Sequence, residues 1–222
     1  MSVSHNLSDI HKNIHHAAQT CDRNGDDITL IAVSKRQPLD RITAALNAGQ
    51  RIFGENRVQD AMKTWGPLRE KHDDITVHLI GPLQSNKAAE AVQTFDVIQT
   101  IDRPKIARAL HKEMDTQNRH LPCMIQVNTG EEPQKSGVLP ADFPALYEIC
   151  TKELGLNITG LMCIPPQDEA PGLHFALLRK LATRYNLPHL SMGMSHDYTS
   201  AIHFGATHIR VGSALFGTRD DD

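Results

Sequence analysis

A lysine follows the first strongly apolar run of the chain. The run Leu30–Ser34 (LIAVS) is followed directly by Lys35, so the lysine is expected at the end of a buried strand. A lysine in an apolar, partly desolvated environment has a lowered pKa and can form a Schiff base with an aldehyde. Position alone equally allows a solvated lysine at a strand end. Lys35 is therefore a candidate covalent site that needs support from other residues.

That support comes from two turns of small residues near the end of the chain, SMGMS at 191–195 and VGSALFG at 211–217. Each runs into an expected helix and offers a hydroxyl, Ser195 in the first and Ser213 in the second. Backbone N–H groups at such places bind anions, although a Gly/Ser turn can also be a simple tight connection. Two such turns facing a strand-end lysine indicate a phosphorylated aldehyde, and pyridoxal 5′-phosphate (PLP) satisfies both ends.

Arg210 precedes the second turn and is expected to point inward beside the ring of the bound aldehyde. An arginine stays protonated and only donates hydrogen bonds. If it donates to a pyridine nitrogen, that nitrogen stays unprotonated and the ring becomes a weak electron sink. The alternative is an arginine paired with a carboxylate of a preceding loop.

These residues can act together only in a fold that brings the ends of several strands close to one another. The sequence predicts such a fold, because short apolar runs alternate with helical patterns along it. The expected strands number about eight: 29–34, 51–55, 76–81, 95–100, 122–128, 157–164, 189–193 and 207–212. Eight parallel strands with crossover helices predict an α/β fold of the (β/α)₈ TIM-barrel type, whose function gathers at the carboxyl ends of the strands. A doubly wound open sheet is the alternative at this length.

The helical segments start and stop at recognisable residues. They are expected at about 38–49, 87–92, 103–110 and 171–181, and an extra helix at about 6–21 precedes the first strand. No low-complexity linker divides the chain. We therefore expect one domain over residues 1–222.

Composition limits the possible functions. The 222 residues carry a net charge of −3, which argues against nucleic-acid binding. No apolar run reaches the roughly 18 residues that span a membrane. The start of the chain lacks the pattern of a signal peptide, so a cytoplasmic location is expected. The four cysteines are expected to be reduced, with Cys123 and Cys163 buried. His11, His15 and His16 are interpreted as a solvated helix face, and no metal site is expected.

Six segments together resemble a known family: AVSK (32–35), FGENRVQ (53–59), HLIGPLQSNK (78–87), GLMCIPP (160–166), HLSMGMSHD (189–197) and THIRVGSALFGTR (207–219). Their order and placement resemble the pyridoxal phosphate homeostasis family over nearly the whole chain. The resemblance implies a single barrel like the N-terminal domain of alanine racemase, with PLP bound as a lysine Schiff base.

The resemblance also implies roles for individual residues. Lys35 matches the Schiff-base lysine, Arg210 the arginine at the pyridine nitrogen, and Ser195, Gly212 and Ser213 the phosphate-binding turns. Three further residues match positions near the cofactor: Met194, through its backbone, Asn56 and His78. The family is regarded as buffering, storing or delivering PLP without robust catalysis. A monomer is expected, with transient contact with PLP-dependent apoenzymes.

Two enzyme functions stay open. A PLP-dependent racemase needs a second acid/base group, usually a tyrosine, and among Tyr147, Tyr185 and Tyr198 only Tyr198 is expected near the barrel mouth. A class I aldolase would use Lys35 to bind its substrate without PLP. An absorption band that borohydride removes would separate PLP binding from the aldolase chemistry.

Overall fold

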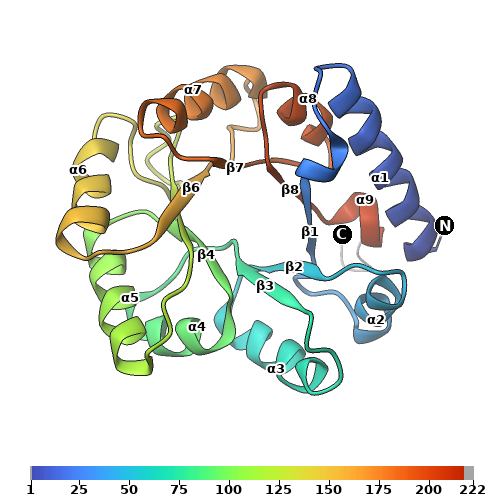
Figure 1. Ribbon diagram of the computed structural model, residues 1–222, viewed down its shortest axis with the longest axis horizontal. Helices are drawn as coiled ribbons and strands as arrows, with labels where there is room; N and C mark the ends of the chain where they lie inside the picture. The colour runs from blue at the N-terminus through green and yellow to red at the C-terminus, as the bar shows by residue number, and fades with distance from the viewer. Residues whose placement is uncertain (1, 218–222) are drawn as a thin grey trace.

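The computed structural model describes residues 2–217 and shows eight parallel strands closed into a barrel, with helices around the outside (Figure 1). The strands are β1 (Thr29–Val33), β2 (Ile52–Glu55), β3 (Thr76–Leu79), β4 (Val97–Ile101), β5 (Cys123–Gln126), β6 (Ile158–Met162), β7 (His189–Met194) and β8 (His208–Val211). This confirms the predicted (β/α)₈ barrel.

The first and last strands close the ring. Ala32 of β1 lies opposite Phe53 of β2, and Ile31 of β1 lies opposite Arg210 of β8. Because β1 pairs on both sides, the sheet has no free edge there. The alternative of an open doubly wound sheet is therefore wrong.

The helices follow the strands around the ring. They are α1 (Val3–Gln19), α2 (Leu39–Asn47), α3 (Val58–Arg69), α4 (Ala88–Thr94), α5 (Pro104–Gln117), α6 (Phe143–Glu148), α7 (Pro171–Arg184), α8 (Tyr198–His203) and α9 (Ser213–Phe216). Short 3₁₀ turns lie at Gly25–Asp27 and Ser85–Lys87, and a π-helical segment at Ile149–Glu153 extends α6.

The predicted extra N-terminal helix is present as α1. It begins at Val3, earlier than expected, because the Ser2 side chain accepts a hydrogen bond from the N–H of His5 and caps the helix. Its apolar face, which includes Ile10 and Ile14, is buried, and the helix packs against α2, α8 and α9. Figure 1 shows α1 beside α8 and α9 at one side of the ring. The helix therefore lies outside the part of the barrel where the first strand, β1, pairs with the last strand, β8.

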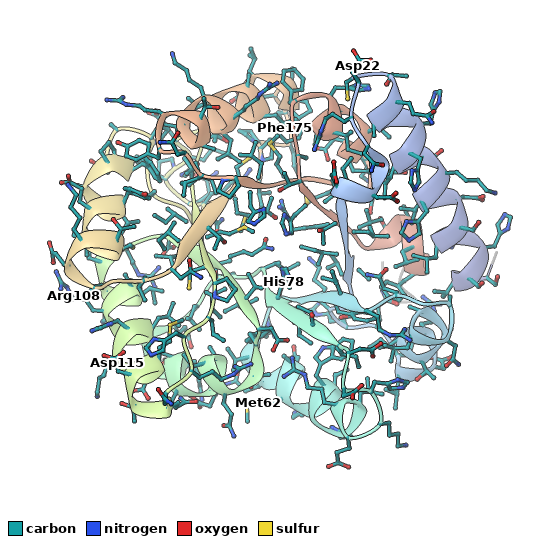
Figure 2. The ribbon with its side chains drawn as sticks, viewed as in Figure 1. Asp22, Met62, His78, Arg108, Asp115 and Phe175 are labelled. Carbon is teal, nitrogen blue, oxygen red and sulfur yellow. The ribbon has the colours of Figure 1, made fainter. Side chains whose placement is uncertain are left out.

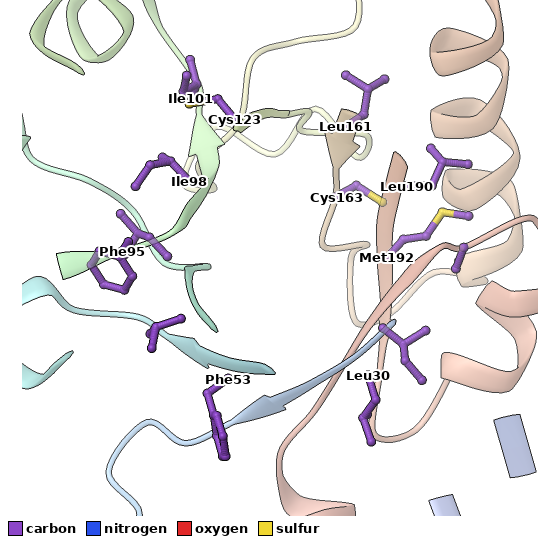
Figure 3. Close-up of a cluster of buried hydrophobic side chains, with 14 of the residues drawn as sticks. Leu30, Phe53, Phe95, Ile98, Ile101, Cys123, Leu161, Cys163, Leu190 and Met192 are labelled. Atoms are coloured by element: carbon purple, nitrogen blue, oxygen red, sulfur yellow. The ribbon is translucent and has the colours of Figure 1, made fainter. Parts of the chain in front are cut away.

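The outer faces of the strands form the main core. Side chains such as Phe53, Ile98 and Leu190 project from the strands toward the helices (Figure 3). Full burial of one such side chain stabilises the fold by roughly 1.5–3 kcal/mol. Cys123 and Cys163 are buried here with free thiols, as predicted.

The inner face of the barrel is different in character. Several of its buried side chains are polar, and they come from β3, β4, β7 and β8: His78, Gln99, Ser191 and Arg210. In Figure 2 the label of His78 lies inside the ring of strands, whereas those of Met62, Arg108 and Asp115 lie out among the helices. Buried polar groups are costly unless they are hydrogen-bonded, so these four side chains need hydrogen-bond partners inside the barrel.

Three further points concern what the sequence predicts. No helix within residues 2–217 is both long and apolar enough to cross a membrane. His11, His15 and His16 lie on the exposed face of α1, as interpreted. Thr218 and Arg219, the end of the last family-like segment, lie outside the described residues.

Candidate cofactor site

A buried chain of hydrogen bonds crosses the barrel interior. Arg210 Nη1 donates to Ser191 Oγ over 2.7 Å, and Ser191 Oγ donates to Gln99 Oε1 over 2.6 Å. Gln99 Nε2 lies 2.8 Å from His78 Nδ1. All four side chains are at most 5% exposed. The barrel thus places a charged group and a histidine at the two ends of one connected polar chain.

Arg210 has a second anchor in the interior. Its Nη2 donates to the carbonyl oxygen of Cys163 over 2.8 Å. Within residues 2–217 no carboxylate forms an ion pair with this guanidinium, so the carboxylate-paired alternative is wrong. Burial lowers the pKa of Arg210 from its usual value, and the Cys163 and Asp197 side chains oppose that shift. A buried cation held only by neutral acceptors favours an additional acceptor from a ligand.

The turns after β7 and β8 meet at the barrel mouth. Ser195 Oγ accepts hydrogen bonds from the backbone N–H groups of Gly212 and Ala214, over 3.2 and 3.3 Å. The Met194 N–H donates to Asp197 Oδ1 over 2.5 Å. Three backbone donors therefore already hold oxygen atoms. Sequence reasoning placed the two turns together but missed Ala214 and Asp197, because backbone donors and a local carboxylate leave no signal of residue type.

Lys35 lies two residues beyond the end of β1 and is partly buried. A Cβ added to Gly212 would lie 3.4 Å from Val33 Cβ, so the turn after β8 packs against the strand that carries Lys35. The lysine and the backbone donors of Gly212 therefore belong to one end of the barrel.

Glu55, at the end of β2, is a buried carboxyl beside Lys35 that the sequence analysis did not select. Its Oε1 accepts hydrogen bonds from Ser34 Oγ over 2.5 Å and from Trp65 Nε1 over 3.4 Å. Burial raises the pKa of Glu55, while those hydrogen bonds and the positive charge of Lys35 lower it. The sequence feature that could have identified Glu55 is its position at the end of an apolar strand.

Asn56 directly follows β2, and His78 lies within the neighbouring strand β3. A Cβ on Gly81 would lie 2.3 Å from the carbonyl oxygen of Asn56, so only glycine allows the loop after β3 to approach Asn56. Burial lowers the pKa of His78 to about 3, and the nearby His208 adds to that shift. His78 is therefore a neutral imidazole near neutral pH.

The hydroxyl groups of the tyrosines have partners in the helical layer or pack there. Tyr198 is buried, and its hydroxyl accepts a hydrogen bond from Asn13 Nδ2 of α1 over 3.3 Å. Tyr147 and Tyr185 pack on each other and on Phe143 in the helical layer. Tyr198 follows Asp197 in the turn after β7, as expected, and a Cβ added to Gly193 would lie 2.9 Å from the Tyr198 Cα, but the Tyr198 hydroxyl is directed at Asn13 of α1.

Comparison with known proteins places the chain in a family. Residues 5–220 match the family described as alanine racemase, N-terminal domain. A pyridoxal phosphate homeostasis protein of Vibrio cholerae is 40% identical, with 99% of this chain and 97% of that protein covered. One from Escherichia coli K12 is 38% identical, with 98% and 97% covered.

Solved structures agree with this assignment. PipY of Synechococcus elongatus, solved with PLP bound, has a TM-score of 0.84 and 34% identity, and covers 97% of this chain and 100% of its own. Alanine racemase of Clostridium difficile, at 12% identity and a TM-score of 0.73, shares the fold, and the match covers 58% of its length. The chain belongs to the pyridoxal phosphate homeostasis protein family.

Proposed function

We propose that this protein binds PLP at the carboxyl end of its barrel, as a Schiff base on Lys35, and serves in PLP homeostasis. When bound, the cofactor supplies an aldehyde that reacts with a lysine amine, a phosphate and a ring nitrogen that accepts a hydrogen bond. The relatives are named for PLP homeostasis, and the PipY structure has PLP bound.

The observation that carries the proposal is the buried Arg210 guanidinium, which donates to neutral oxygens and forms no ion pair within residues 2–217. An unprotonated ring nitrogen would give this cation a further acceptor without the cost of a second buried charge. Because Arg210 stays protonated, it would keep that nitrogen unprotonated. This arrangement favours holding the cofactor over using its ring as an electron sink.

The phosphate end fits the two turns at the barrel mouth. The N–H groups of Gly212 and Ala214 already converge on one oxygen, Ser195 Oγ, and phosphate oxygens are stronger acceptors of such bonds. The Ser195 and Ser213 hydroxyls and the Met194 N–H would add donors. Asn56 and His78 would lie beside the ring. The proposed binding set is Lys35, Asn56, His78, Met194, Ser195, Arg210, Gly212 and Ser213.

We further propose that the protein has no robust racemase activity. A two-base racemase needs an acid/base group on the second face of the cofactor. The hydroxyl of Tyr198 faces Asn13, and Tyr147 and Tyr185 lie in the helical layer. The role that we propose instead is storage, delivery or buffering of PLP in the cytoplasm by a monomer, with transient contact with apoenzymes.

The test is a PLP titration of the wild type, Lys35→Ala and Lys152→Ala, followed by visible absorption. Lys152 is an exposed lysine paired with Glu148, far from the barrel mouth in sequence and fold, and serves as the matched control. We expect the Schiff-base band in the wild type and in Lys152→Ala, and its loss in Lys35→Ala. A band that persists in Lys35→Ala contradicts the assignment of the lysine. An alanine racemisation assay and PLP transfer to a defined apoenzyme then separate catalysis from delivery.

A further inference from the structure

The buried chain from Arg210 to His78 has a direction that its chemistry fixes. Arginine has only donors, so Ser191 Oγ must accept from Arg210. The hydroxyl proton of Ser191 is then free for Gln99 Oε1, which lies 2.6 Å away. With its oxygen used in this way, Gln99 presents its NH₂ group to His78 Nδ1 over 2.8 Å.

The opposite direction is less favourable. If the Gln99 amide were reversed, its nitrogen would face Ser191 Oγ and its oxygen would face His78 Nδ1. The Ser191 hydroxyl proton would then lose the acceptor that Gln99 Oε1 provides in the structure. A buried donor without an acceptor costs about 1–3 kcal/mol, a factor of roughly 5 to 150 between the two arrangements.

Burial and the anchoring of Arg210 strengthen this arrangement. Gln99 and Ser191 are 0% exposed, so water does not compete for their polar atoms. The Cys163 carbonyl oxygen holds the second Nη of Arg210, and two acceptors on two arms fix the plane of the guanidinium. The chain therefore connects the orientation of Arg210 to the protonation of His78.

We propose that Ser191 and Gln99 are positioning residues that hold Arg210 in place for the cofactor ring and keep His78 as the tautomer protonated on Nε2. The orientation of Arg210 for a ring nitrogen rests on the proposed PLP function. The tautomer of His78 does not rest on that function, because the hydrogen bonds from Arg210 to His78 are all formed without a ligand. Neither Ser191 nor Gln99 is among the residues that the resemblance assigns to the site.

The first experiment uses the wild-type protein without PLP. Imidazole ¹⁵N resonances, with His78 assigned by comparison with His78→Asn, report which nitrogen carries the proton. We expect an unprotonated Nδ1 and a protonated Nε2 near neutral pH. A proton on Nδ1 would overturn the inference. The readout is made on the wild type, and His78→Asn serves only to assign the resonance.

The second experiment substitutes residues of the hydrogen-bonded chain that runs from Arg210 to His78. In Ser191→Ala, Arg210 loses one acceptor and Gln99 is free to reverse, so we expect a PLP Kd raised roughly tenfold and a mixture of His78 tautomers. In Gln99→Glu the carboxylate has no donor for Nδ1, so we expect the proton of His78 to move to Nδ1. The matched control is Thr100→Val, because the Thr100 Oγ1 atom is buried and has no hydrogen-bond partner within residues 2–217. It should keep the wild-type Kd and tautomer.

The outcomes separate the inference from the proposed function. Ser191→Ala with a wild-type circular dichroism spectrum and an unchanged Kd would overturn the positioning role. If Ser191→Ala does not fold, Gln99→Glu decides, and an Nδ1 that stays unprotonated in that variant contradicts the proposed order of hydrogen bonds. If the wild type binds no PLP, the proposed function is wrong, and so is the proposal that Ser191 and Gln99 position Arg210 for the cofactor ring. The ¹⁵N measurement would still decide the tautomer of His78.

Discussion

The interior of the barrel and its mouth are built differently. In the interior, Arg210, Ser191, Gln99 and His78 are buried and bonded to one another before any ligand is present. At the mouth, the donors are backbone N–H groups whose present acceptors are side chains of the same loops, such as Ser195. Under the proposed function, the interior is a preorganised site for the cofactor ring and the mouth an exchangeable site for its phosphate.

Loss of the guanidinium should give the largest effect. Arg210→Met leaves the Ser191 hydroxyl and the Cys163 carbonyl without their donor and removes the proposed partner of the ring nitrogen. Because hydrogen bonds to a charged group contribute about 1.5–3 kcal/mol, PLP affinity should fall roughly 10- to 100-fold. Isothermal titration with PLP and with pyridoxal, which lacks the phosphate, should show the loss for both ligands.

The matched control for that variant is Arg108→Met on α5, which removes an arginine from an exposed ion pair with Glu153. Surface ion pairs contribute little, so this variant should bind both ligands normally. Wild-type affinity in Arg210→Met would show that the interior does not recognise the ring.

The neutral state of His78 should make the interior sensitive to acid. Its pKa is depressed to about 3 by burial, so the folded state takes up its proton at lower pH than the unfolded chain does. The stabilisation that follows is fully present above the unfolded pKa of about 6.5 and is lost as the pH falls toward 3, by about 1.4 kcal/mol per pH unit.

Urea unfolding of the protein without PLP, at pH values across this window, measures that loss. His78→Asn should show a shallower decline of the free energy of unfolding than the wild type. Equal slopes in the two proteins would mean that His78 takes up its proton normally in the fold, contrary to its burial beside Gln99.

Removal of a donor at the mouth should have a smaller and ligand-specific effect. Ser195→Ala loses one hydroxyl, but the N–H groups of Gly212 and Ala214 remain and become free for phosphate. A neutral hydrogen bond contributes about 0.5–1.5 kcal/mol, so PLP affinity should fall roughly 2- to 10-fold and pyridoxal affinity should not change. An equal loss for both ligands would contradict the assignment of this turn to the phosphate.

Tyr198→Phe should have the smallest effect. The hydroxyl that it removes accepts a hydrogen bond from Asn13 of α1. Binding of PLP and of pyridoxal should both stay at the wild-type level by the same titration. A clear loss of either would reopen the racemase interpretation, in which this tyrosine acts on the cofactor.

The fold was accessible from the sequence because apolar runs and turn residues report burial directly. All eight strands begin and end within two residues of their expected ranges. Helix ends were less predictable. Helix α5 continues to Gln117, well beyond Leu110, and stops where Asn118 adopts a left-handed conformation with φ 48°.

The site was only partly accessible, for physical reasons. Lys35, Arg210 and Ser195 stand at strand ends, where residue type and position together indicate chemistry. Gln99 and Ser191 lie within strands, and their partners come from other strands, so no local pattern could pair them. The direction of the Tyr198 side chain, toward α1, likewise depends on the packing of α1 against α8, which are far apart in the sequence.

The most direct test of the proposed function is to load the protein with PLP, reduce it with borohydride, and map the labelled peptide by mass spectrometry. Reduction makes a lysine adduct permanent, so the labelled residue is read without any substitution. We expect the label on Lys35, in the peptide that follows β1. A label mainly on another lysine, or no label on a protein that has bound PLP, would contradict the Schiff base at the centre of the proposal.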